Sequence, residues 1–137
     1  MIVYAQEQNL SAEDYISVVG STYMRDRRPV ANVERVARIL AGSNSNMIVS
    51  ARDEHGAIVG VLRGVSDGEW VCYVADLAVR EGYQRKGIGT GLLDHCKAIL
   101  GPGMGIVLVA YPEAIDYYRK IGMGEMQAFY IDREVRT

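Results

Sequence analysis

The residues best suited to chemistry lie in one stretch, residues 76–93, where a glycine-rich turn joins an expected buried strand to an expected helix. The strand is predicted to end at Val79, and the helix to begin among the glycines at 87, 89 and 91. Such a turn leaves backbone N–H groups without partners at a helix N-terminus, and glycines do not obstruct them. This arrangement suits a pyrophosphate, and Arg85 and Lys86 add positive charge beside it.

Three phosphate-binding motifs compete for this turn. A P-loop, GxxxxGK[ST], needs a lysine after its glycines, whereas Lys86 precedes them. A dinucleotide fingerprint, GxGxxG, needs its third glycine one place later than Gly91, and no acidic residue ends the following strand to meet a ribose. The third motif is Q/R-x-x-G-x-G/A, which residues 84–89, Gln-Arg-Lys-Gly-Ile-Gly, match. It is the signature of the GNAT superfamily of N-acetyltransferases, and this stretch resembles that family.

The resemblance, to the small single-domain bacterial members of the GNAT superfamily, extends in both directions. Leu77–Val79 looks like the family's acyl-CoA-binding strand, and Pro112–Met123 is similar to its late A-x-x-x-Y-x-x-x-G-F helix. The order of the expected elements also matches over nearly the whole chain. The resemblance implies an acyltransferase that moves acetyl from acetyl-CoA directly to a primary amine of a small molecule. A protein or peptide N-acetyltransferase and a non-catalytic acyl-CoA sensor are the alternatives.

The resemblance also implies how coenzyme A is bound. The amides of residues 85–90 would wrap the pyrophosphate, while Leu77 and Val79 would pair their main chain with the pantetheine arm, as an added strand does. The arm is expected in a V between this strand and the strand at 106–110, where a backbone N–H near Leu77 would stabilise the thioester oxygen. The implied coenzyme-binding residues are Leu77, Ala78, Val79, Gln84, Arg85, Lys86, Gly87, Ile88, Gly89 and Thr90.

Tyr118 matches the family tyrosine that protonates the departing thiolate as a general acid. From helical periodicity alone, Tyr118 would be a core tyrosine on an amphipathic helix. Its neighbour Tyr117 is interpreted as a packing residue. The chain departs from the family twice: Tyr111 replaces a common pantetheine-contacting asparagine, and the strand at 106–110 lacks the frequent carboxylate base. The nearest carboxylate is that of Asp76, which either acts as the base or forms hydrogen bonds at the strand end. Deprotonation through water is the other route.

The acceptor is expected under the two N-terminal helices and their basic connection. In this connection Arg25, Arg27 and Arg28 either hold an anionic group of the acceptor through guanidinium contacts or form a solvated loop. Trp70 and Tyr73 either line a pocket for an aromatic or aliphatic amine or pack within the sheet. These residues do not specify the amine.

The elements that position these residues form one domain, residues 1–137. Ser11 and Asn32 have the side chains of helix N-caps ahead of apolar residues at helical spacing. From residue 47 to 79, three apolar runs separated by turn signals predict an antiparallel meander, and the strand–helix–strand order that follows predicts a parallel pair. The fold class is α+β (mixed α/β), a mixed, mostly antiparallel sheet flanked by about four helices. The expected strands are 2–6, 47–52, 58–65, 70–79, 106–110 and 129–131, and the expected helices follow Ser11, Asn32, Gly87 and Tyr111.

Composition narrows the classes of function further. A net charge of −2 gives no basic footprint for nucleic acid. Two cysteines and two histidines, far apart, indicate no metal site, and no apolar stretch approaches the ~20 residues of a membrane span. The N-terminus lacks the features of a signal peptide, so a cytoplasmic location is expected. The expected partners are acetyl-CoA, an amine acceptor and, because members of the family often pair, a second copy in a homodimer.

Overall fold

The computed structural model describes residues 1–43 and 47–137, and within them five strands form one sheet in the order β1-β2-β3-β4-β5. The first four strands are antiparallel neighbours, and β5 runs parallel to β4 after a crossover through α3. The predicted meander and the predicted parallel pair are confirmed. The elements are β1 Val3–Gln6, α1 Ala12–Val19, the 3-10 helix η1 Tyr23–Arg27, α2 Val33–Gly42, β2 Ile48–Arg52, β3 Ile58–Ser66, β4 Val71–Val79, α3 Ile88–Leu100, β5 Gly105–Leu108, the 3-10 helix η3 Pro112–Ala114 and α4 Ile115–Lys120.

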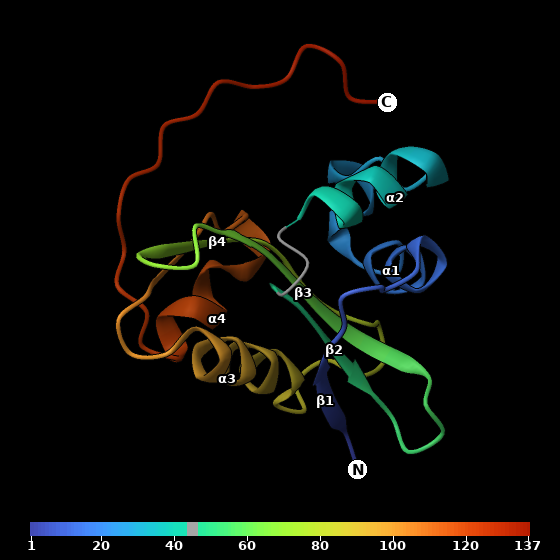
Figure 1. Ribbon diagram of the computed structural model, residues 1–137, viewed down its shortest axis with the longest axis horizontal. Helices are drawn as coiled ribbons and strands as arrows, with labels where there is room; N and C mark the ends of the chain where they lie inside the picture. The colour runs from blue at the N-terminus through green and yellow to red at the C-terminus, as the bar shows by residue number, and fades with distance from the viewer. Residues whose placement is uncertain (44–46) are drawn as a thin grey trace.

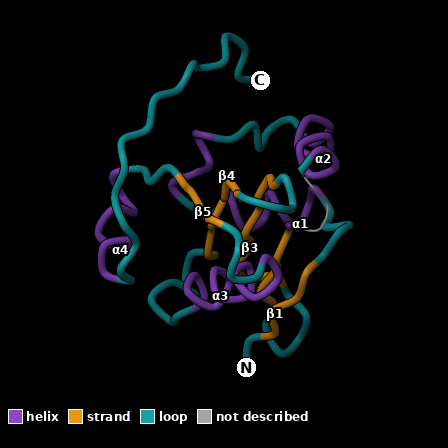
Figure 2. The backbone as a smooth tube through the Cα atoms, turned by 60° about the vertical axis from the view of Figure 1, so that its left-hand side comes forward, coloured by secondary structure: helices purple, strands orange, loops and turns teal. Residues whose placement is uncertain are grey.

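Helices cover both faces of the sheet (Figures 1 and 2). On one face, Tyr15 and Val18 of α1 are buried with Val36 of α2 in one hydrophobic cluster. On the other face, Leu92 and Cys96 of α3 are buried in a second cluster. The described residues therefore form a mixed α+β fold with four α-helices, as predicted.

The two N-terminal helices begin at the residues that the sequence marks as caps. The Ser11 hydroxyl accepts a hydrogen bond from the Asp14 amide at 3.1 Å, and the Asn32 side chain accepts one from the Arg35 amide at 3.0 Å. Each bond satisfies an N–H that the helix itself leaves unpaired. The Asn32 cap fixes the end of the connection between α1 and α2, and Arg28 in that connection reaches β4.

The sheet separates at a bulge in β4. In the register with β3, Asp76 and Val74 pair with consecutive residues, so Ala75 is the extra residue. β5 pairs with β4 only up to this point, with Val71–Val74 opposite Gly105–Leu108. Among the described residues the pairing goes no further, which fits the predicted V between the two strands.

The predicted last strand, 129–131, does not form in the structure. Residues 123–137 contain neither helix nor strand, and Phe129 and Ile131 are 91% and 99% exposed. Their apolar side chains suit a strand, but a strand also needs a hydrogen-bonding neighbour, and none of the described residues pairs with this segment. The predicted strand 106–110 also ends early, at Leu108.

Candidate active site

The diverging ends of β4 and β5 form a narrow cleft. Its volume is about 20 Å³, little more than one water molecule needs, so a larger ligand has to part its walls. Leu77 and Tyr118, the predicted oxyanion donor and the predicted acid, both line it. The full lining is Tyr23, Met24, Val74, Ala75, Leu77, Leu108, Val109, Ala110, Tyr111 and Tyr118.

Tyr118 lies half-buried on α4, with its ring 5.2 Å from the Tyr117 ring in an edge-on contact. Its hydroxyl has no hydrogen-bond partner among the residues that the structure describes. Burial raises the pKa of the Tyr118 phenol, and the neighbouring Tyr23 and Tyr117 raise it further. The phenol therefore keeps its proton at neutral pH, and that proton is available to a basic group in the cleft.

The predicted glycine turn has the geometry of an open helix start. Gly87 is the N-cap of α3 with φ of +81°, a left-handed value that suits glycine, and Arg85 adopts the same region with φ of +64°. The first backbone hydrogen bond of the helix runs from the Gly91 amide to the Gly87 carbonyl at 3.0 Å. The amides of residues 88–90 precede it and have no partner within the helix.

These features fit the diphosphate of acetyl-CoA. Amides at a helix N-terminus and the exposed cations of Arg85 and Lys86 meet the needs of a doubly charged anion. The Gln84 side-chain amide donates to the Val79 carbonyl at 3.1 Å, which ties the turn to the end of β4. The Ala78 side chain is buried in the hydrophobic cluster that also contains Tyr15 of α1.

Tyr117 brings the cleft and the turn together. Its hydroxyl lies 2.9 Å from the Thr90 hydroxyl, and a Cβ built on Gly89 would lie 3.0 Å from the same oxygen. α4 therefore contacts the first turn of α3 through Tyr117 while its neighbour Tyr118 lines the cleft. The interpretation of Tyr117 as packing misses this contact, because helical periodicity carries no information about a residue 27 positions away.

Gly91 belongs to packing and not to the turn. A Cβ at this position would clash with the hydroxyl oxygen of Tyr4 and with its Cζ. The Tyr4 ring, from β1, therefore occupies the space that a side chain at residue 91 would need.

Gly91→Ala is expected to destabilise the protein, although alanine normally stabilises a helix interior over glycine. The added methyl group has to displace the Tyr4 ring, which stacks on His95 at 4.9 Å, and such overpacking costs about 1–3 kcal/mol. Urea unfolding measures the change. Gly42→Ala is the control, because a Cβ at Gly42 meets no heavy atom within 4 Å. A more stable Gly91→Ala protein would contradict the packing role.

Asp76 is engaged on both oxygens. Its carboxylate accepts hydrogen bonds at 2.6 Å from Arg28 Nε, Arg63 Nε and the Tyr15 hydroxyl, and the residue is 1% exposed. Burial opposes ionisation, but the charges of Arg63 and Arg28 outweigh it and lower the pKa of Asp76. A carboxylate held in this way is a poor proton acceptor. The geometry fits the hydrogen-bonding alternative at the strand end, and it argues against Asp76 as the general base.

The three arginines expected at the acceptor differ in their surroundings, and Arg25 is the exposed one, with Asp26 as its only ion-pair partner among the described residues. The Arg28 guanidinium is committed to the protein: besides Asp76 it donates to the carbonyls of Arg27 and Ala75, both at 2.7 Å, and to the Tyr111 hydroxyl at 3.2 Å. An anion of the acceptor would have to compete with all of these groups. Arg27 is more accessible, and its guanidinium lies 4.2 Å from the centre of the Tyr111 ring. Arg27 therefore stands at the rim of the cleft.

Three residues at this rim are not assigned to the acceptor by the sequence analysis. Tyr23 and Tyr111 line the cleft, and Glu113 accepts a hydrogen bond from Arg27 Nη1 at 2.9 Å. Only Tyr111 among them has a sequence signal, because it replaces an asparagine that is common in the family. Trp70 and Tyr73, which the sequence analysis does place at the acceptor, are outside the cleft lining and exposed, Trp70 by 75%.

The described residues offer neither a cluster of metal ligands nor a membrane-spanning helix. No group of three or more histidine, cysteine, aspartate or glutamate side chains in residues 1–43 and 47–137 lies close enough to hold a metal ion. None of the helices in the same ranges has the length and apolar character to cross a membrane.

Comparisons with known proteins agree with this geometry. The sequence model of the acetyltransferase (GNAT) family matches residues 9–123. No curated protein matches the sequence. Similar solved structures include a GNAT-family acetyltransferase from Streptococcus pneumoniae TIGR4, with 24% identity over 98% of this chain and 100% of that chain and a TM-score of 0.71. Glucosamine-6-phosphate N-acetyltransferase from Arabidopsis thaliana has 18% identity over 98% and 99% of the two chains and a TM-score of 0.67.

An aminoglycoside acetyltransferase from an uncultured soil metagenomic sample, solved in complex with sisomicin, has 20% identity over 98% of this chain and 95% of that chain and a TM-score of 0.69. At these identities the solved structures show a shared fold. The family model shows more, because it covers most of the chain and includes both the glycine turn and Tyr118. The chain therefore belongs to the GNAT family of acetyltransferases, which use acetyl-CoA as co-substrate.

Proposed function

We propose that this acetyltransferase transfers the acetyl group of acetyl-CoA directly to a primary amine of a small molecule. The observation that carries the proposal is the cleft between β4 and β5, because Leu77 and Tyr118 line it together. Tyr117, next to Tyr118, contacts the glycine turn, so the two halves of the site lie side by side. Acetyl-CoA supplies an acetyl group activated as a thioester.

The residues that would hold the coenzyme follow one another along the chain. The amides of residues 88–90, with Arg85 and Lys86, would bind the diphosphate, and Gln84 would keep the turn against β4. The main chain of Leu77–Val79 would bind the pantetheine arm in the manner of an added strand. Since Gly87 and Gly89 carry no side chains, the backbone can approach the phosphates closely.

Two groups of the chain would act on the reacting atoms. The backbone N–H near Leu77 would donate a hydrogen bond to the thioester oxygen as that oxygen gains negative charge. The Tyr118 hydroxyl would donate its proton to the sulfur of the leaving thiolate. The acceptor ammonium would lose its proton to water, since the Asp76 carboxylate is occupied by two guanidinium groups.

The acceptor would enter at the rim formed by Tyr23, Tyr111 and Arg27. Glu113 stands at this rim, and its carboxylate suits an ammonium group of the acceptor.

The test is to mix the purified protein with acetyl-CoA and a panel of amines, including glucosamine-6-phosphate, an aminoglycoside and a lysine-containing peptide, and to follow the release of free thiol. The expected result is thiol release that depends on a small amine. Release with the peptide alone would favour the protein acetyltransferase. Tight binding of coenzyme A with no release for any amine would favour the acyl-CoA sensor.

Gly89→Val is expected to weaken acetyl-CoA binding at least about tenfold, because the new side chain both meets the Tyr117 hydroxyl and obstructs the neighbouring amides. Isothermal titration calorimetry gives the dissociation constant. Gly42→Val in α2 is the control, since it adds the same side chain where nothing lies within 4 Å of the Cβ. An unchanged dissociation constant in a folded Gly89→Val protein would place the diphosphate elsewhere.

A further inference from the structure

One positive charge of the chain lies at the mouth of the cleft. Arg27 ends η1, the segment that begins with the cleft-lining Tyr23, and Glu113 lies in η3, directly after the cleft-lining Tyr111. The Arg27 guanidinium donates a hydrogen bond to the Glu113 carboxylate at 2.9 Å, and the two side chains are 33% and 43% exposed. This ion pair therefore joins the two segments that supply Tyr23 and Tyr111 to the cleft.

Two aromatic rings complete the surroundings of this guanidinium. Its central carbon, Cζ, lies 4.2 Å from the centre of the Tyr111 ring and 5.5 Å from the centre of the Tyr23 ring. The two rings meet edge to face at 6.3 Å. The faces of aromatic rings attract cations, and a carboxylate beside them adds a full negative charge. Tyr23, Tyr111 and Glu113 thus form a binding site for a cation, which we call the cation subsite, and Arg27 occupies it.

The contacts of Arg27 are weak enough to exchange. An ion pair that is a third or more exposed contributes little, because water screens the charges and two long side chains lose freedom. With Arg27 in place the cleft has a volume of only about 20 Å³, so an acceptor has to move a group at this mouth in order to enter. A cation that replaced Arg27 would meet the same rings and the same carboxylate, and the charge of the site would stay the same.

The cation subsite suits a group of the acceptor other than the amine that reacts. A nitrogen attacks the thioester only after it has lost its proton, whereas a carboxylate close to an amine favours the charged form. A second cation of the acceptor, which does not react, can stay in the subsite throughout the transfer. An anionic group fits less well, since it would meet Glu113 and would have to compete with this carboxylate for Arg27.

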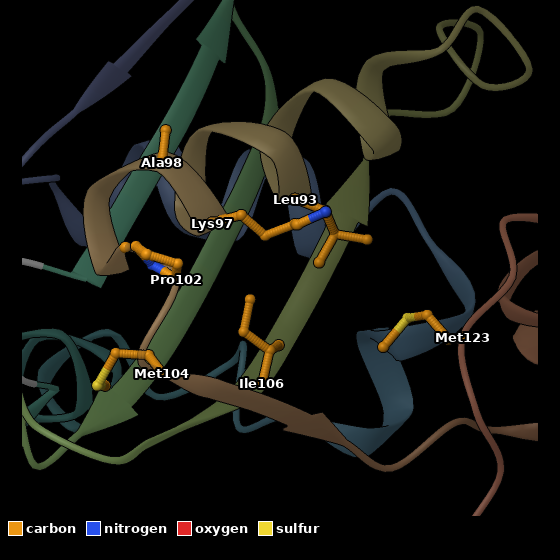
Figure 3. A pocket seen from close by; sticks show the side chains of 8 residues that line it. Leu93, Lys97, Ala98, Pro102, Met104, Ile106 and Met123 are labelled. Carbon is orange, nitrogen blue, oxygen red and sulfur yellow. The ribbon is translucent and has the colours of Figure 1, made fainter.

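The groove on the other side of the sheet has a different character. Figure 3 shows Leu93 and Lys97 of α3 and Ile106 of β5 facing this groove, whose volume is about 650 Å³. Lys97 is the one charged residue of its lining. The groove therefore offers a cation no counter-charge, and a charged acceptor is better matched by the mouth of the cleft.

We infer that the acceptor carries a second cationic group, an ammonium or a guanidinium, which displaces Arg27 from the cation subsite when the acceptor enters the cleft. The inference rests on the proposed transfer of acetyl to an amine, and it narrows the acceptor to diamines and related dications. Arg27 is then a specificity-determining residue, because it fills the subsite of the resting protein until another cation replaces it. A monoamine has no second cation, so its one ammonium cannot both occupy the subsite and react.

Three five-carbon amines test the inference. The far end of the chain is an ammonium in 1,5-diaminopentane, a methyl group in pentylamine and a carboxylate in 5-aminopentanoate. With saturating acetyl-CoA, thiol release is expected to give the diamine a KM at least about tenfold below the other two. Glu113→Gln is expected to remove most of this difference. Arg27→Ala is expected to lower the KM for the diamine about threefold, because the competing cation of the protein is gone.

A matched ion pair outside the cleft supplies the control. Arg119 of α4 holds Glu125 at the same distance of 2.9 Å, and neither residue lines the cleft. Glu125→Gln is therefore expected to leave all three KM values unchanged, and circular dichroism checks that each variant is folded. The inference is overturned, with the proposed function intact, when the diamine does not have the lowest KM. A preference for the diamine that survives Glu113→Gln overturns it as well.

A binding measurement separates this inference from the proposed function. When none of the amines releases thiol, the proposed function fails, and calorimetric titration of the coenzyme A-bound protein with 1,5-diaminopentane decides the inference alone. Tighter binding of the diamine to Arg27→Ala than to the wild-type protein supports the cation subsite. Equal binding to the two proteins, or binding to neither, overturns it.

Discussion

Tyr118→Phe is expected to lower kcat by about 10²–10⁴-fold, the usual loss when a general acid is removed, while acetyl-CoA affinity changes little. The hydroxyl lies on a cleft-lining side chain and has no hydrogen-bond partner among the described residues, so its removal breaks no contact of the resting protein. What is lost is the proton for the departing thiolate. Steady-state rates with the best acceptor from the amine panel, together with calorimetric binding of acetyl-CoA, separate the two effects.

Tyr117→Phe is the matched control, because it removes the same group from the adjacent residue. Its hydroxyl contacts Thr90 at the turn, so we expect a change mainly in the KM for acetyl-CoA and little change in kcat. Because burial raises the pKa of Tyr118, the acid stays protonated, and the wild-type rate is not expected to fall between about pH 7 and 9 through its ionisation. A Tyr118→Phe enzyme with the wild-type kcat would remove this residue from the chemistry.

Asp76→Asn is expected to cost about 3–5 kcal/mol of unfolding free energy, which is a large part of the stability of an ordinary domain. The substitution leaves the largely buried Arg28 and Arg63 side chains, 15% and 11% exposed, without their counter-charge. Urea unfolding followed by circular dichroism measures the loss. Glu113→Gln is the control, since it removes a carboxylate that is paired with Arg27 at the surface, and we expect it to change stability little.

The acid dependence of stability provides a second measurement on the same variant. The pKa of Asp76 is lowered in the folded protein, so its contribution is fully present above the unfolded value of ~3.9 and is lost as the pH falls through the folded value. Wild-type protein should therefore lose its advantage over Asp76→Asn in strong acid. A constant difference between the two proteins from neutral pH into strong acid would show that the charge of Asp76 is not what stabilises the fold.

Local patterns in the sequence predict most of the fold. The caps at Ser11 and Asn32, the meander and the helix after Gly87 depend on residues within a few positions of one another, and the structure has them all. The resemblance to the family also predicts site roles for Leu77 and Tyr118, and both residues line one cleft in the structure.

What the sequence does not predict depends on contacts between distant residues. Asp76 meets Arg28 across 48 positions and Tyr15 across 61, and no periodicity reports such a meeting. Gly91 looks like a phosphate-binding glycine until the Tyr4 ring is seen to cover it. The strand expected at 129–131 does not form, for a related reason. Its apolar side chains favour a strand, but they do not specify which strand lies beside it.

Arg28 adds a polar link between the α1–α2 connection and the sheet. The Arg28 guanidinium donates a hydrogen bond to the carbonyl of Ala75, the bulge residue where β4 and β5 part. The Arg28 backbone belongs to the connection between α1 and α2. Loosening of the helical pair therefore removes support from the point at which the strands diverge. Heat inactivation, the melting of α1 and α2 and the loss of the sheet should accordingly share one transition temperature.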